Sequence, residues 1–90
     1  MTPEQLKASV ALKYDYEGAP TVVATGQNQV ADVILDRAKR AGVPIVEDPK
    51  LAYVLSKVPL GDEIPPELYR AVAEVLVFIL RLEGELEEKA

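Results

Sequence analysis

The chain contains no cysteine, no histidine and no tryptophan among its 90 residues. Without cysteine it can form neither a disulfide nor a thiolate nucleophile, and without histidine it has no imidazole base and no zinc site of the usual kind. Its two serines, Ser9 and Ser56, therefore lack the base that would activate them. We expect a protein that is not an enzyme and that binds no cofactor and no metal.

Long apolar runs and clusters of positive charge are also missing. The longest apolar run, Val75–Leu80, is far shorter than the roughly 20 residues that cross a bilayer, and the N-terminus has no signal-like apolar core. The one basic cluster, Arg37, Lys39 and Arg40, lies where the last turn of a helix is expected, and the helix dipole favours positive charge there. We expect a soluble protein that neither inserts into a membrane nor binds nucleic acid.

The composition is that of one small globular domain, with 49% hydrophobic and 28% charged residues. The net charge of −5 is uneven, because residues 83–90 hold four Glu against one Lys. Acidic segments with little to bury stay disordered. We therefore predict a flexible N-terminal segment over residues 1–7, a folded domain over 8–82 and an acidic disordered tail over 83–90.

The first half of the chain has the pattern of a β-hairpin followed by a helix. Apolar β-formers predict strands over residues 8–14 and 21–24, and the Gly- and Pro-containing stretch 15–20 between them predicts a turn. Two strands joined so briefly should pair as a hairpin. Apolar residues at helical spacing predict a helix over residues 29–41, with Asn28 as its N-cap.

The second half has the pattern of a third strand and two further helices. Gly42 is placed to end the first helix, and the apolar stretch 43–46 predicts an edge strand reached by a parallel crossover. Asp48 is placed to cap a short helix, and a longer helix is predicted over residues 66–82, although part of it would also suit a buried strand. The fold class is α/β (α+β): a small mixed β-sheet, with a hairpin and a β-α-β crossover, surrounded by three to four helices.

Two pairs of acidic residues are the remaining candidates for chemistry. Glu47 with Asp48, and Asp62 with Glu63, could bind a hard cation or act in acid–base catalysis. Both pairs precede helix starts, where acidic side chains are favoured by capping and by the helix dipole, and neither has the spacing of a calcium loop. The structural role is the favoured interpretation.

Five stretches in a fixed order resemble one known family: residues 10–15 (Val-Ala-Leu-Lys-Tyr-Asp), 19–24 (Ala-Pro-Thr-Val-Val-Ala), 42–47 (Gly-Val-Pro-Ile-Val-Glu), 61–65 (Gly-Asp-Glu-Ile-Pro) and 67–76 (Glu-Leu-Tyr-Arg-Ala-Val-Ala-Glu-Val-Leu). Together they are similar to the cytoplasmic domain of FlhB/YscU-type switch proteins, over residues 8–82. These proteins belong to the flagellar and type III export gates. The resemblance implies a mixed sheet surrounded by helices and a cytoplasmic location, peripheral at the membrane export gate.

The resemblance has one clear departure, at the start of the chain. Family members carry a self-cleaving Asn-Pro-Thr-His loop, and the matching positions here are Glu4, Gln5, Leu6 and Lys7. Asparagine cyclisation needs the Asn side-chain amide, so we expect no self-cleavage. The family's membrane helices and the strand upstream of the cut have no counterpart in these 90 residues, which resemble the downstream cleavage fragment.

The resemblance also implies a site. In the family an apolar patch is implicated in docking export substrates, and it corresponds here to Ala19, Pro20, Ala73 and Leu76. The alternative is an ordinary Ala-Pro turn and two core residues. The expected function is a non-enzymatic accessory or binding module of the export apparatus. Its expected partners are export-apparatus proteins, exported flagellar or type III subunits, and the upstream fragment of a full-length relative. The alternative is a structural homo-oligomer or a regulatory competitor of the full-length switch protein.

Overall fold

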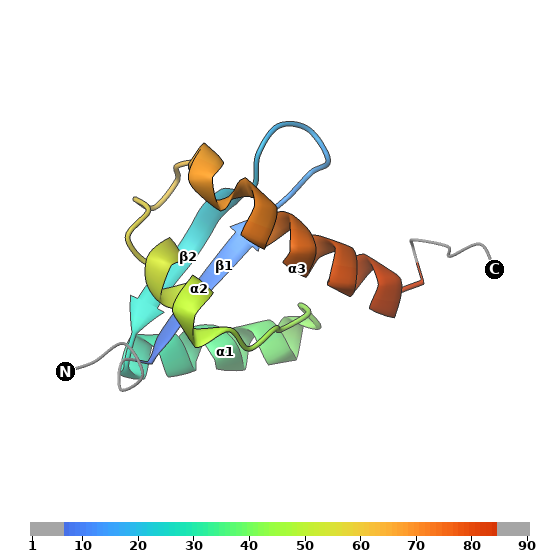
Figure 1. Ribbon diagram of the computed structural model, residues 1–90. Coiled ribbons are helices and arrows are strands. Elements are labelled where there is room, and N and C mark those ends of the chain that lie inside the picture. The colour runs from blue at the N-terminus through green and yellow to red at the C-terminus, as the bar shows by residue number, and fades with distance from the viewer. Residues whose placement is uncertain (1–6, 85–90) are drawn as a thin grey trace.

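A computed structural model describes residues 7–84, and all structural statements below concern those residues. The chain forms a β-hairpin, a long helix, a short helix and a final long helix (Figure 1). Their bounds are β1 Ala8–Lys13, β2 Thr21–Gln27, α1 Gln29–Ala41, α2 Pro49–Leu55, the 3-10 helix η1 Pro66–Leu68 and α3 Tyr69–Leu82. The α+β fold class, the hairpin and the helices predicted from the sequence are confirmed.

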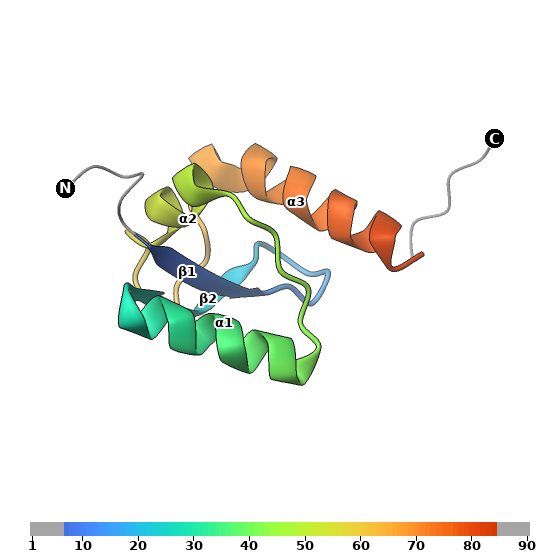
Figure 2. The same cartoon turned by 90° about the horizontal axis from the view of Figure 1, so that it is seen from below.

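The hairpin is antiparallel and separates two layers of helix. Figure 2 shows α1 on one side of the sheet, with α2 and α3 on the other. Successive strand residues face opposite sides, so Val10 and Leu12 pack toward the core while Ser9 donates a hydrogen bond to the carbonyl of Ala31 in α1 (3.0 Å). The register shifts between Ala11 and Leu12, where β2 carries an extra residue.

Helix boundaries follow from local chemistry, with one correction. Asp48 caps α2 as predicted, because its carboxylate accepts from the N–H of Leu51 (3.1 Å). Gly42 ends α1 in the left-handed conformation, φ 73° and ψ 22°. Asn28 is the N-cap residue of α1 as predicted, but it turns the chain at φ 57° and its side chain makes no cap hydrogen bond.

The third strand predicted over residues 43–46 is not formed. The predicted β-α-β crossover is therefore absent from the described residues, and the sheet is antiparallel instead of mixed. Within residues 7–84 the sheet has two antiparallel strands. The N–H of Val43 is used to end α1, bonding to the carbonyl of Ala38 (2.9 Å), and Pro44 has no N–H to donate. The stretch has no regular secondary structure and lines the same hollow as β1, with Val43, Ile45 and Val46 exposed by 50%, 39% and 37%.

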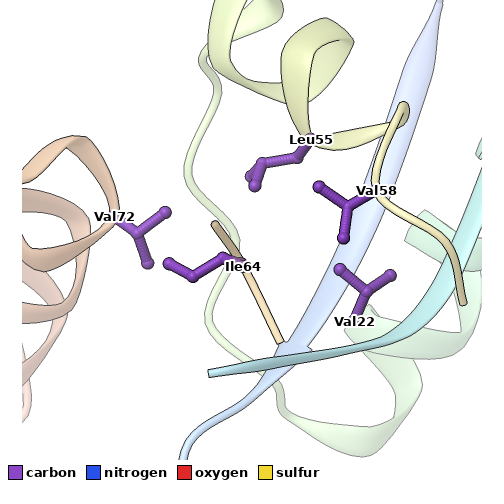
Figure 3. Close-up of a cluster of buried hydrophobic side chains, with 5 residues drawn as sticks. All are labelled: Val22, Leu55, Val58, Ile64 and Val72. Carbon is purple, nitrogen blue, oxygen red and sulfur yellow. The ribbon is translucent and has the colours of Figure 1, made fainter. Parts of the chain in front are cut away.

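The core is a small cluster of side chains contributed by four separate parts of the chain. Figure 3 shows the side chains of one cluster, Val22, Leu55, Val58, Ile64 and Val72, converging from β2, α2, the loop between α2 and η1, and α3. Burying an aliphatic side chain of this size contributes about 1.5–3 kcal/mol. A cluster of five such residues is therefore sensitive to a single polar substitution.

The outer edge of β2 is covered by the loop that precedes η1. The N–H of Val22 donates to the carbonyl of Asp62 (2.9 Å), and the carbonyl of Val22 accepts from Gly61 (2.8 Å). The N–H of Ile64 donates to the carbonyl of Pro20 (3.0 Å). These bonds satisfy backbone groups that an exposed strand edge would leave open.

The chain ends are described only in part. The expected flexible segment 1–7 is represented by Lys7, which forms an ion pair with Asp32 (3.2 Å). At the other end Glu83 and Gly84 form a turn after α3, with the Glu83 N–H bonded to the carbonyl of Ile79 (3.0 Å). The remaining residues of both predicted terminal segments lie outside the described part of the chain. None of the helices between residues 7 and 84 is long and apolar enough to cross a membrane.

Val72 and Ala73 are adjacent on α3 but differ in burial, which gives a direct test of the packing. Val72 is 1% exposed, whereas Ala73 is exposed to solvent. We predict that Val72→Asp, which buries an unpaired carboxylate, lowers the free energy of unfolding by at least about 3 kcal/mol. Ala73→Asp should lower it by about 0.5 kcal/mol or less.

Thermal unfolding followed by circular dichroism measures both effects. In a domain of this size 1 kcal/mol shifts the midpoint by about 4–8 °C, so the two variants should differ by more than about 10 °C. Equal destabilisation would contradict the assignment of Val72 to the core and of Ala73 to the surface.

Candidate docking site

The four residues that the sequence singled out line one hollow on the protein surface. Ala19 and Pro20 lie at the end of the hairpin turn, and Ala73 and Leu76 lie on α3. We call this the docking hollow; it has a volume of about 410 Å³ and is lined by Tyr14, Gly18, Ala19, Pro20, Glu63, Ile64, Tyr69, Val72, Ala73 and Leu76. The fold thus brings together residues from opposite ends of the chain.

The four residues differ in how they contribute to the hollow. Pro20 is buried, Ala19 and Leu76 are half-buried, and Ala73 is exposed. Ala19 and Leu76 also pack against the core cluster. Each of these two residues therefore contacts the core on one side and lines the docking hollow on the other. Ala73, with its small side chain, leaves open the space above it.

Ile64 holds the two walls of the docking hollow in place. Its side chain is 2% exposed and lies in the core cluster with Val72 of α3 (Figure 3). Its backbone N–H is bonded to the carbonyl of Pro20 in the other wall. The turn itself is shaped by Asp15, whose carboxylate accepts from the N–H of Glu17 (3.1 Å), and by Gly18 at φ 69°. The position of the hairpin turn relative to α3 is therefore fixed by the core.

Tyr14, Tyr69 and Glu63 line the docking hollow and were not picked out from the sequence. The sequence did contain a signal for Tyr69, because it precedes Ala73 by four positions and Leu76 by seven, so all three share a helix face. No comparable signal exists for Glu63, which reaches the hollow from a loop.

A second hollow lies beside the outer edge of β1. We call it the edge groove; it has a volume of about 350 Å³. Residues of β1 and the stretch 43–46 both line it. Figure 2 shows the chain between α1 and α2, which contains this stretch, passing β1. Apolar residues of α1 and α3 line it as well, namely Ile34, Leu35, Ala38, Val72, Val75, Leu76, Ile79 and Leu80. The two hollows share Tyr14, Val72 and Leu76.

Three of the polar side chains considered for catalysis, those of Ser9, Asp48 and Ser56, form structural hydrogen bonds. Ser9 donates to the backbone of α1, and Ser56 donates to the carbonyl of Tyr53 (2.6 Å). Of the acidic pairs, Asp48 caps α2. Within residues 7–84 no group of three or more His, Cys, Asp or Glu side chains could hold a metal ion.

Comparison with known proteins identifies the family. The profile of the FlhB HrpN YscU SpaS family matches residues 5–79. The chain belongs to this family. It is a family of the flagellar and type III protein export apparatus in bacteria. The resemblance inferred from the sequence is thus confirmed.

Two sequence relatives illustrate how much of a family member the chain represents. It is 43% identical over 86 residues to the uncharacterized protein YlqH of Bacillus subtilis, covering 93% of this chain and 92% of YlqH. It is 44% identical over 77 residues to the flagellar biosynthetic protein FlhB of Escherichia coli, covering 82% of this chain and 20% of FlhB. The chain therefore spans nearly all of YlqH but about a fifth of FlhB.

Solved structures share the fold. The cytoplasmic domain of FlhB from Shewanella putrefaciens superposes with a TM-score of 0.77 at 37% identity, covering 81% of this chain and 63% of that one. A mutated EscU C-terminal domain superposes with a TM-score of 0.75 at 25% identity, covering 81% and 92%. The hairpin and helices described above are thus the fold of a C-terminal cytoplasmic domain of this family.

Proposed function

We propose that this chain is a non-enzymatic binding module of the flagellar or type III export apparatus, which acts on the cytoplasmic side of the export gate. Exported subunits or components of the gate dock in the docking hollow. The observation that supports this most strongly is the convergence of Ala19 and Pro20 with Ala73 and Leu76 around one apolar hollow. In a small domain whose main core cluster has five buried residues, an open apolar hollow is typical of a surface that meets a partner.

The size of the docking hollow fits a weak and reversible contact. A single apolar side chain that buries about 100–150 Å² gains roughly 2.5–4 kcal/mol at 25 cal/mol per Å². Part of this gain is offset by the lost freedom of the partner segment. A dissociation constant near 1 mM corresponds to about 4 kcal/mol. Such transient binding suits a module that must release each partner after docking it.

Ala73→Asp tests the docking function, because it places a charge in the hollow while leaving the core intact. We predict that it weakens binding of an exported subunit from the same organism at least about 10-fold, since a carboxylate would have to be desolvated against the partner's apolar group. Phe78→Asp is the matched control, because Phe78 is 52% exposed on the same helix and lines neither hollow. Its affinity should stay within about twofold of the unmodified protein.

Binding is measured by isothermal titration calorimetry or, for weak complexes, by NMR titration. If both variants lose affinity equally, the effect is one of charge on α3 and the docking hollow is not the site. If neither loses affinity, the partner binds elsewhere on the domain.

A second candidate function, favoured by the edge groove, is strand addition. The outer edge of β2 is covered by residues 61–64, whereas within residues 7–84 no backbone group bonds to the outer edge of β1. The carbonyl of Lys7 accepts from the N–H of Asn28, which follows β2 directly. Backbone groups of successive residues in a strand point alternately to its two sides, so those of Ser9 and Ala11 face β2 and those of Val10 and Leu12 face outward. An added strand would pair with that edge and fill the edge groove between the helix layers.

The source of such a strand would be the upstream fragment of a full-length family member, and the chain would then compete with that protein's own downstream fragment. Its alternative source is a second copy of the chain, which would make a structural homo-oligomer. Both roles would leave the docking hollow unused.

Amide hydrogen exchange by NMR tests strand addition at single residues. The probe is a synthetic peptide with the sequence that precedes the self-cleaving loop in Escherichia coli FlhB. We predict that the amides of Val10 and Leu12 exchange rapidly in the free protein and become protected at millimolar peptide, because their N–H groups gain partners. The amides of Ser9 and Ala11, which face β2, are the internal control and should be protected throughout.

A version of the peptide that is N-methylated at alternate residues keeps the side chains but cannot pair, and it should give no protection. If Val10 and Leu12 are already protected in a free dimer, a second copy fills the groove. If they are unprotected with and without peptide, β1 does not accept a strand.

A further inference from the structure

Glu63 is the one charged side chain that lines the docking hollow. The other lining residues in the described chain are apolar, aromatic or glycine. The loop bonds on both sides of Glu63 hold its backbone: the carbonyl of Asp62 accepts from Val22, and the N–H of Ile64 donates to Pro20. Glu63 itself forms an isolated bridge with Thr21 of β2. The backbone of Glu63 is thus held against the edge of β2 by the hydrogen bonds of its two neighbours.

The carboxylate of Glu63 points toward the hairpin turn. One of its oxygens, Oε2, lies 3.6 Å from the position that a Cβ atom on Gly18 would take. The ion pairs found within residues 7–84 are Lys7–Asp32, Asp36–Arg40 and Arg70–Glu74, and none of them uses Glu63. The docking hollow therefore presents a negatively charged hydrogen-bond acceptor beside an apolar surface, and none of these ion pairs supplies it with a cation.

We propose that Glu63 sets the specificity of the docking hollow by selecting partner segments with a lysine or arginine within about two residues of the apolar side chain that they insert. This inference rests on the proposed docking function and names the partner's chemistry. A cation placed there would form a charge-assisted hydrogen bond to the carboxylate. An acidic residue at the same place would be repelled, so the pair discriminates between partners as well as adding affinity.

The position of Glu63 beside apolar walls makes the pair stronger than one on an open surface, because solvent screens it less. Glu63 is nevertheless exposed, so the expected gain is that of a partly solvated pair. Measured values for exposed pairs correspond to a change in affinity of up to roughly fivefold. A chain with net charge −5 attracts any cationic peptide, and this general attraction also raises the measured affinity. The experiment must therefore separate it from the local effect of Glu63.

The test uses two synthetic peptides and two variants of the full chain. The peptides are Ser-Lys-Gly-Leu-Gly-Lys-Ser and Ser-Gln-Gly-Leu-Gly-Gln-Ser, which offer the same apolar residue with and without neighbouring cations. The variants are Glu63→Gln and Asp62→Asn, which change the net charge equally. Asp62 is the matched control because it does not line the docking hollow and contacts β2 through its backbone carbonyl, which the substitution keeps.

We expect the unmodified protein to bind the lysine peptide roughly threefold to fivefold more tightly than the glutamine peptide in about 50 mM salt, as followed by NMR shifts of Ala73 and Leu76. Glu63→Gln should abolish this preference by weakening binding of the lysine peptide. Asp62→Asn should keep the preference. Loss of the preference in both variants, or in neither, would overturn the role of Glu63.

Charge reversal separates a failure of this inference from a failure of the docking function. Glu63→Lys should prefer Ser-Glu-Gly-Leu-Gly-Glu-Ser over the lysine peptide, and a persisting preference for lysine would overturn the inference. If the unmodified protein binds both original peptides equally at the docking hollow, docking stands and the selection by Glu63 is wrong. If neither peptide shifts Ala73 and Leu76, the docking function itself is contradicted.

Discussion

The attachment of residues 61–64 to the outer edge of β2 is the constraint on which the rest of the structure depends. Three backbone hydrogen bonds join this loop to Pro20 and Val22, and the same loop delivers Ile64 into the core against Val72. Val72 is the one fully buried residue of α3, so the packing of Ile64 against it is the main contact that holds α3 to this loop. Because the same loop is bonded to Pro20, it also fixes the position of the hairpin turn relative to α3. The buried contact between Ile64 and Val72 thus sets the distance between the hairpin turn and α3.

The same constraint accounts for the shape and the lining of the docking hollow. The docking hollow is apolar because several of its lining residues, among them Ile64, Val72 and Leu76, also belong to or pack against the core cluster. Its one charged lining residue, Glu63, comes from the loop, residues 61–64, that joins the hairpin to α3. The two hollows share Val72 and Leu76, so a partner in either one meets the same helix face. Membership of the FlhB HrpN YscU SpaS family places this surface in the context of protein export.

Most features governed by neighbouring residues were predictable from the sequence, with the side-chain cap at Asn28 as the exception. Features governed by distant residues were not predictable from the local pattern, and the four residues of the docking hollow were found through the family resemblance. The capping by Asp48, the left-handed Gly42 and the hairpin depend on short-range chemistry, and the sequence predicts them correctly. A strand at 43–46 needs a neighbour with free backbone groups at the right distance, which its own apolar pattern cannot supply. Glu63 reaches the docking hollow through bonds between loop and sheet, and its sequence neighbours give no sign of this.

A double-mutant cycle between the two walls of the docking hollow tests most directly whether they form one site. Ala19→Gln and Ala73→Gln each narrow the hollow from a different segment, and the affinity for an exported subunit is measured for both single variants and for the double variant. Residues that contact the same partner group are expected to couple by about 0.5 kcal/mol or more, so the double variant should lose less affinity than the sum of the single losses. Additive losses would show that the hairpin turn and α3 act independently, and would contradict the account.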